Sequence, residues 1–111
     1  MAKVSLCMIV RDEEANLRDC VGPVRELFDE IVVLDTGSTD RTQAIAEELG
    51  ANVFEMAWPD DFAKARTQSL RHATGDWVFW LDADDRIDPD NRDKLKALMS
   101  NLPDADVAYH M

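Results

Sequence analysis

The sequence predicts an α/β fold, with a Rossmann-like, mostly parallel sheet and flanking helices. The first observation is that short apolar segments of strand length alternate with segments of helical periodicity along most of the chain. Strands that alternate with helices in this way lie parallel and are joined by right-handed crossovers. The second is that 111 residues with 46% hydrophobic content suffice for one packed core, so residues 1–111 are expected to form one domain.

The first strand and the first helix are expected near the N-terminus. Residues 4–10 (VSLCMIV) are typical of a buried strand. A helical pattern follows, and its apolar positions are Leu17, Cys20, Val21 and Val24. The pair Gly22-Pro23 should break or kink this helix, because proline lacks a backbone N–H and its ring clashes with the preceding turn.

The second strand is expected over residues 30–34 (EIVVL) and ends at Asp35. A helix should follow with Ser38 or Thr39 as its N-cap, because a hydroxyl oxygen can accept a hydrogen bond from a free N–H group of the first turn. Gly50 is expected to end that helix. Its apolar positions are Ile45, Ala46 and Leu49.

The remaining elements continue the alternation. They are a short third strand over residues 52–55, a helix over about residues 62–73 closed by Gly75, and a fourth strand over residues 77–81 (WVFWL). A last helix should begin with Asp88 as its cap and Pro89 at its first position, where the missing N–H of proline costs nothing.

The last residues alternate between apolar and polar types at Val107, Tyr109 and Met111, as in a half-buried strand. Because the sequence stops there without a turn, cap or polar tail, it indicates a domain cut off inside an element. The alternative is an edge strand that completes a small domain. A sheet edge exposed in this way could pair two copies of the chain into a homodimer.

Charge and composition exclude several classes of partner. Lys and Arg number 12 against 23 Asp and Glu, and the net charge of -11 repels nucleic acid. No apolar stretch reaches the ~20 residues of a membrane span, and the N-terminus lacks a cleavable signal, so a cytoplasmic protein is expected. Cys7 and Cys20 form no metal or redox motif, and both are expected to be reduced structural thiols.

Two of the predicted strands end in aspartate, at Asp35 and at Asp82. Parallel strands open onto the same edge of a sheet, so these carboxylates can line one crevice, where open α/β sheets bind ligands. Asp35 could accept hydrogen bonds from a ribose hydroxyl or a base N–H. The alternative is that Asp35 only caps the turn or the helix that follows it.

Asp82, Asp84 and Asp85 crowd like charges at the tip of the fourth strand, which raises their pKa values unless a cation lies among them. An EF-hand loop is excluded, because Arg86 stands at the fifth position and Ile87 replaces the turn glycine. Mg²⁺ or Mn²⁺ held by one or two carboxylates, with water and phosphate oxygens completing the shell, suits the cluster better. The alternative is a solvated acidic loop.

A diphosphate approaching so acidic a surface needs fixed positive groups as well as a cation. Arg66 and Arg11 are the candidates. Arg66 could bind phosphate with its planar guanidinium group, and the alternative is an ordinary ion pair with a neighbouring acid.

Histidine and tryptophan residues contribute less to the predicted ligand site. Neither His72 nor His110 has a recognisable partner, so neither is assigned a catalytic role. Trp77 and Trp80 fall inside the apolar fourth strand and are expected in the core, whereas Trp58 could stack on a base or a sugar.

Four segments in register together resemble the family-2 glycosyltransferases of the GT-A fold. They are residues 5–14 (SLCMIVRDEE), 29–40 (DEIVVLDTGSTD), 61–66 (DFAKAR) and 75–84 (GDWVFWLDAD). The resemblance covers nearly all of the chain, and four segments in the family's order are far more specific than one Asp-x-Asp motif. Thr67 departs from the family, which often has Asn there, and Gly22-Pro23 interrupts a usually continuous helix.

The resemblance implies a role for each candidate residue. Asp35 would bind the uracil or ribose side of a nucleotide-sugar, and the residues bordering that pocket would be Val10, Arg11 and Glu13. Arg66 would approach the nucleotide and its diphosphate. Asp82 would contact the ribose or the metal, Asp84 would be the principal metal ligand, and Asp85 would lie beside it.

The resemblance also implies an activity. A family member transfers a sugar from a nucleotide diphosphate, most often UDP, to an acceptor, normally with inversion and with Mn²⁺ or Mg²⁺. The catalytic base and the acceptor-binding elements of the family lie downstream of the matched segment, beyond Met111. The chain is therefore expected to supply the donor and metal site, to lack the base, and to be inactive when isolated.

Three other readings remain open from the sequence. A receiver-like phosphoacceptor domain has similar length, but it needs an Asp at the end of the third strand, where this chain has Glu55. A non-catalytic interaction module could keep the fold without the ligand. A metal-dependent nucleotidyltransferase would carry a glycine-rich basic loop after its first strand, and residues 11–14 (RDEE) are not one.

Overall fold

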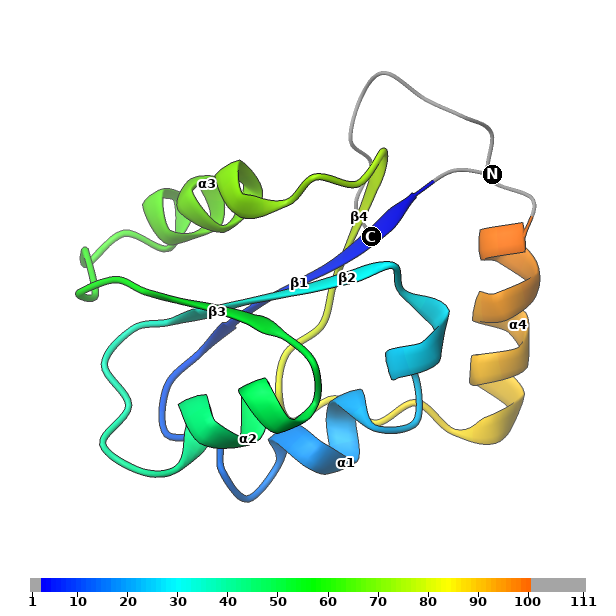
Figure 1. The fold of residues 1–111 in the computed structure, drawn as a ribbon, viewed down its shortest axis with the longest axis horizontal. Helices are drawn as coiled ribbons and strands as arrows, with labels where there is room; N and C mark the ends of the chain where they lie inside the picture. Colours follow the sequence, from blue (N-terminus) through cyan, green and yellow to red (C-terminus); the bar gives the residue numbers. More distant parts are fainter. Residues whose placement is uncertain (1–2, 101–111) are drawn as a thin grey trace.

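The computed structural model describes residues 3–100 and contains one parallel four-stranded sheet (Figure 1). Its strands are β1 (Val4–Val10), β2 (Glu30–Asp35), β3 (Asn52–Glu55) and β4 (Trp77–Trp80). They lie in the order β3-β2-β1-β4, and every neighbouring pair is parallel. The predicted parallel sheet is therefore confirmed.

Helices cover both faces of this sheet. They are α1 (Leu17–Val21), the 3-10 helix η1 (Arg25–Leu27), α2 (Thr42–Glu48), α3 (Phe62–His72) and α4 (Pro89–Ser100). Figure 1 shows α3 over one face and α1 and α2 over the opposite face. Because both faces are covered, β1 and β4 and the centre of β2 carry apolar residues in almost every position.

The core divides between the two faces in the two-residue period of a strand. On β1, Leu6 and Met8 belong to the large cluster that includes residues of α1 and α2, while Cys7 belongs to a smaller cluster. The smaller cluster joins Cys7 to Val32 and Val78, with Leu70 of α3 packed against them. Burial raises the pKa of the Cys7 thiol to about 11, so it stays protonated, and the thiol is free as expected.

The structure confirms two helix boundaries and corrects two others. Helix α1 ends at Val21, as the Gly22-Pro23 pair predicted, and Asp88 caps α4 by accepting a hydrogen bond from the Asn91 N–H at 2.8 Å. The predicted N-cap of α2 at Ser38 or Thr39 is wrong, because that helix begins at Thr42, whose N–H donates to Asp40 at 2.9 Å.

The other correction concerns the end of α3, which is capped at Ala73 rather than closed by Gly75. The strand predicted at residues 107–111, the homodimer through it and His110 all lie outside the described residues. In residues 3–100 no helix is both long and apolar enough to cross a membrane.

Gly75 is required by a close approach of two backbones. A Cβ atom at this position would lie 2.5 Å from Ser5 Oγ, 2.8 Å from Ser5 N and 3.0 Å from Lys3 O. Since two of these atoms are backbone, the clash cannot be relieved by rotating a side chain. Gly75→Ala should therefore lower the free energy of unfolding by about 1–3 kcal/mol, the usual cost of overpacking, in a urea titration.

The double variant Gly75→Ala with Ser5→Ala separates the two sources of this clash. It removes the hydroxyl oxygen but leaves Ser5 N and Lys3 O in place. We therefore expect the double variant to be no more stable than Gly75→Ala. Full recovery of stability in the double variant would show that the hydroxyl alone excludes a side chain at position 75.

Candidate functional site

Three cavities lie along the carboxyl edge of the sheet, in the order of the strands. The first, of about 440 Å³, is lined by Asp35 and Glu55 at the ends of β2 and β3. The second, of about 300 Å³, is lined by Val10 and Thr36 at the ends of β1 and β2. The third, of about 180 Å³, lies between β1 and β4 and is lined by Asp82 among others. Open α/β sheets bind their ligands at this edge.

Asp35 is only 1% exposed, and its two oxygens have different surroundings. Its Oδ1 accepts hydrogen bonds from the N–H groups of Gly37 and Ser38, both at 2.8 Å. Its Oδ2 is buried without a hydrogen-bond partner in the described structure, although Asp35 lines the first cavity. Asp35 therefore caps the turn with one oxygen, while its other oxygen has no hydrogen-bond partner among the described residues.

The pKa of Asp35 reflects these contacts. Burial alone raises the pKa of a carboxyl group, but the hydrogen bonds from Ser38 and Gly37 outweigh it and hold the pKa of Asp35 below 3.8. Gly37 completes the turn at φ 118°, a conformation that glycine tolerates without strain. The carboxylate is therefore ionised at neutral pH.

The loop after β1 is bound to the loop after β2 by several hydrogen bonds. Asp12, at a left-handed φ of 52°, accepts from Thr39 N–H at 2.7 Å and donates its own N–H to Ser38 Oγ at 2.8 Å. The Glu13 N–H donates to Thr42 Oγ1 at 2.8 Å. These bonds fix the end of β1 relative to the Asp35 turn.

The predicted border residues surround the second cavity. Val10 is buried, Arg11 is exposed and Glu13 is half-buried, and all of them line this cavity. Trp58 lines it as well and is 40% exposed, so its ring is accessible for stacking. The structure thus brings Val10, Arg11 and Glu13 together, whereas Asp35, which the resemblance places in the same nucleoside pocket, lines the first cavity.

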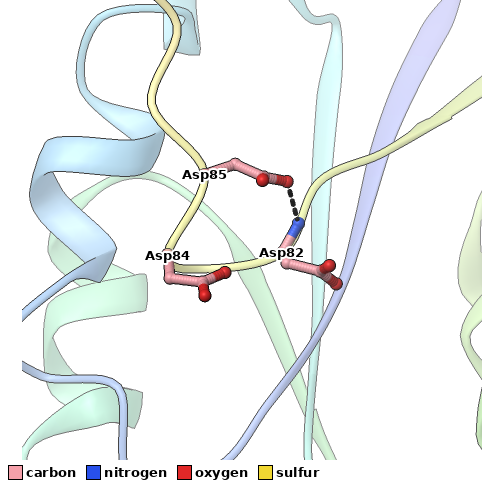
Figure 2. A group of neighbouring side chains, drawn as sticks. All are labelled: Asp82, Asp84 and Asp85. Carbon is pink, nitrogen blue, oxygen red and sulfur yellow. Dashed lines mark hydrogen bonds between the residues drawn. The ribbon is translucent and has the colours of Figure 1, made fainter.

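Asp82, Asp84 and Asp85 occupy the loop after β4 (Figure 2). One carboxylate oxygen from each lies within 4.8 Å of the others, and all three residues are exposed. Figure 2 shows Asp85 turned back toward Asp82, whose N–H donates to Asp85 Oδ2 at 2.8 Å. The carboxylates of Asp82 and Asp84 accept no hydrogen bond from other described residues. Hard oxygen donors this close together fit Mn²⁺ or Mg²⁺.

The acidic loop is fixed to helix α1 and to the residue before it. The Cys20 thiol donates to the Asp82 carbonyl oxygen at 3.3 Å, and the Arg86 guanidinium donates to Asn16 Oδ1 at 2.9 Å. Burial, with a smaller contribution from Asp85, raises the pKa of Cys20 to about 11. Cys20 is therefore a protonated structural thiol, as expected, and it supports the loop.

Arg66, on α3, lines the third cavity together with Asp82 and Asp85. Within the described part of the chain it forms no ion pair, so no described acid supports the alternative of an ordinary salt bridge. Its guanidinium carbon lies 4.7 Å from the centroid of the Trp80 ring instead. Sequence reasoning placed Trp80 in the core and missed this contact with Arg66.

The family model for glycosyl transferase family 2 matches residues 5–111. The chain belongs to this family. Among its relatives, a TPR repeat-containing protein of Synechococcus elongatus is 55% identical over 78% of this chain and 22% of its own length. An uncharacterized glycosyltransferase of Rickettsia felis is 33% identical over 100% of this chain and 39% of its own length. The family-2 chain thus spans about two fifths or less of these relatives.

Solved structures give the same assignment. The chain superimposes on glucosyl-3-phosphoglycerate synthase from Mycobacterium tuberculosis bound to Mn²⁺ and UDP-glucose with a TM-score of 0.66 and 29% identity. This match covers 75% of this chain and 33% of the synthase. The complex of the same enzyme with UDP gives a TM-score of 0.64 and 31% identity over 75% and 34% of the two chains. The fold is that of the GT-A glycosyltransferases.

The strand order argues against the receiver-like alternative. A receiver-like sheet has the order 2-1-3-4-5, whereas the described strands of this family-2 chain have the order β3-β2-β1-β4. The third strand therefore lies at the edge of the described sheet. In a receiver-like sheet the third strand, which carries the phosphoacceptor Asp, lies at the centre.

Proposed function

We propose that this chain is the donor-binding part of a glycosyltransferase that takes its sugar from a UDP-sugar. The observation that carries the proposal is the arrangement of groups along one sheet edge. At one end lies a carboxylate oxygen of Asp35 that has no hydrogen-bond partner in residues 3–100, and the acidic cluster lies at the other. The synthase from Mycobacterium tuberculosis, which has the same fold, binds UDP and Mn²⁺.

In this proposal each side chain acts on a different part of the donor. Asp35 accepts a hydrogen bond from the base or the ribose through Oδ2, while its Oδ1 stays on the turn. The nucleoside pocket is bordered by Val10, Arg11 and Glu13.

The diphosphate end is formed by the third cavity and the acidic loop. Arg66 would donate to the diphosphate with N–H groups that form no ion pair with an acid of residues 3–100. Asp82 and Asp84, with Asp85 beside them, would hold Mn²⁺ or Mg²⁺. When bound, such a cation would offset negative charge on the leaving diphosphate. The carboxylates alone would repel that group, because the chain already carries a net charge of -11.

Transfer to the acceptor requires a base that deprotonates the attacking hydroxyl group. We assign none of the described residues to this role and infer an inverting single displacement completed by residues outside this chain. The 111-residue chain should therefore bind the donor without turning it over. Glycosyl transfer by the isolated chain would contradict this part of the proposal.

Calorimetry with UDP tests the binding proposal directly. We expect UDP to bind in the presence of Mn²⁺ and to lose at least about tenfold in affinity when EDTA removes the metal. ADP and GDP serve as controls for the base, and inorganic pyrophosphate serves as the control for the anion alone. If UDP does not bind with Mn²⁺ present, the chain is better described as a non-catalytic interaction module.

A further inference from the structure

Arg66 lies close to two aromatic rings. Its guanidinium carbon is 4.7 Å from the centroid of Trp80 and 6.0 Å from that of Phe62. Both distances lie within the range of about 6 Å over which a guanidinium group is attracted to an aromatic face. The two rings come from different elements, since Trp80 ends β4 and Phe62 begins α3.

This arrangement explains why Arg66 forms no ion pair with the acids of the described chain. It shares the third cavity with Asp82 and Asp85 in a chain of net charge -11, yet it forms no ion pair with any described residue. Its Nε is buried and lacks a hydrogen-bond partner in residues 3–100. Contact with an aromatic face holds a guanidinium group through its flat side and leaves its N–H donors in the plane free.

The sequence and the fold together produce the contact. Phe62 and Arg66 are four residues apart on α3, a spacing that places two side chains on the same helix face. Trp80 packs with Val78 in the smaller core cluster, which includes Leu70 of α3. Because Trp80 is only two residues before Asp82, its position also fixes Arg66 relative to the acidic loop.

We propose that Trp80 and Phe62 are positioning residues that hold Arg66 with its N–H donors directed to the donor's diphosphate. The inference rests on the proposed function and adds two residues to it. The rings attract the guanidinium group but carry no charge. Arg66 is therefore held in place without a carboxylate partner, and the diphosphate has no such partner to displace. Without them, Arg66 would turn to Asp82 or Asp85.

The first test compares UDP with uridine in the presence of Mn²⁺, because uridine lacks the diphosphate. Trp80→Leu should weaken UDP binding by about tenfold and change uridine binding by less than about twofold. Trp80→Phe keeps an aromatic face and should restore most of the UDP affinity. Equal losses of UDP and uridine, or unchanged UDP binding, would overturn the proposal.

Phe62 provides a second variant that does not threaten folding, because its side chain is 52% exposed. Phe62→Ala should weaken UDP binding by about threefold, and Phe62→Tyr should restore it, because a tyrosine ring offers the same face. Unchanged UDP affinity in Phe62→Ala would remove Phe62 from the proposal. These variants also decide the question if Trp80→Leu proves unstable.

NMR tests the contact without any ligand. The Arg66 Nε–Hε signal should be shifted upfield by ring current in the wild-type chain and should move back in Trp80→Leu, and a signal at the ordinary position would overturn the contact. Absence of UDP binding by the wild-type chain would instead overturn the proposed function, and this inference with it. UDP affinity that is unchanged in both Trp80→Leu and Phe62→Ala would overturn this inference alone.

Discussion

Replacing Asp84 with alanine should abolish most of the Mn²⁺-dependent gain in UDP affinity. The Asp84 carboxylate is exposed, accepts no hydrogen bond from described residues and belongs to the cluster whose oxygens lie within 4.8 Å of one another. Loss of a residue that only supports a metal ligand typically costs about 10- to 100-fold in metal affinity, so loss of a ligand should cost at least as much. Calorimetry of UDP with and without Mn²⁺ measures the effect.

The same substitution should leave the fold intact or stabilise it slightly. Asp84 lies beside Asp82 and Asp85, and removal of one exposed like charge relieves repulsion. The matched control is Asp93→Ala, which removes one exposed carboxylate from α4 outside the cluster. If both variants bind UDP equally well with Mn²⁺, the acidic loop is only a solvated turn.

Replacing Asp35 with asparagine should weaken UDP binding by about 10- to 150-fold, the cost of a hydrogen bond to a charged group. Asparagine has nearly the same shape, and its amide oxygen can still accept the Gly37 and Ser38 N–H groups. Its NH₂ group then takes the place of Oδ2, which puts a donor where we propose that the base N–H or the ribose hydroxyl donates. Calorimetry with UDP and with uridine should show equal losses.

The control for Asp35→Asn is Glu47→Gln, which makes the same change of charge at an exposed position on the neighbouring α2. Its UDP affinity should match that of the wild type within about twofold, because exposed charges are screened at physiological salt. A folded Asp35→Asn chain that binds UDP normally would show that Asp35 only caps the turn.

Asp35 should also make stability depend on pH. Its folded-state pKa lies below 3.8, because hydrogen bonds from Ser38 and Gly37 outweigh the effect of burial. A carboxylate with a lowered pKa contributes stability that is present above its ordinary value and is lost as the pH falls through the folded-state pKa.

Urea unfolding of wild type and Asp35→Asn at several pH values checks this sign. The variant should be less stable by about 1–3 kcal/mol at neutral pH, the cost of weakening a buried hydrogen-bonded group. The difference should shrink as the pH falls below 3.8. A difference that stays constant with pH would show that the charge of Asp35 contributes nothing to folding.

Local pattern predicted the strands and the positions of the acidic groups. Residues 4–10 and 30–34 carry strand-length apolar runs, and the structure places strands over Val4–Val10 and Glu30–Asp35. Parallel strands have their carboxyl ends at one edge, so Asp35 and Asp82 had to face the same side. The resemblance to family 2 added the donor and metal roles, which local pattern alone left open.

Contacts between distant segments could not be predicted in the same way. Hydrogen bonds between the loops after β1 and β2 join residues that are 26 or 27 apart in sequence, and they involve Ser38 and Thr39, so α2 begins only at Thr42. The N-cap rule considers only neighbouring residues, so it favoured Ser38 or Thr39. The Ser38 hydroxyl instead accepts a hydrogen bond from the Asp12 N–H, and the Thr39 N–H donates to the Asp12 carboxylate.

The sequence by itself therefore determined the order of elements, the two acidic strand ends and the family, because periodicity and motif spacing are local properties. The tertiary structure alone decided which partner each polar group has. It binds one oxygen of Asp35 to the turn and leaves the other without a hydrogen-bond partner in residues 3–100, and it sets Arg66 against Trp80 rather than against a described acid. The physical reason is that burial, hydrogen bonds and ring contacts depend on distances that only the packed sheet and α3 establish.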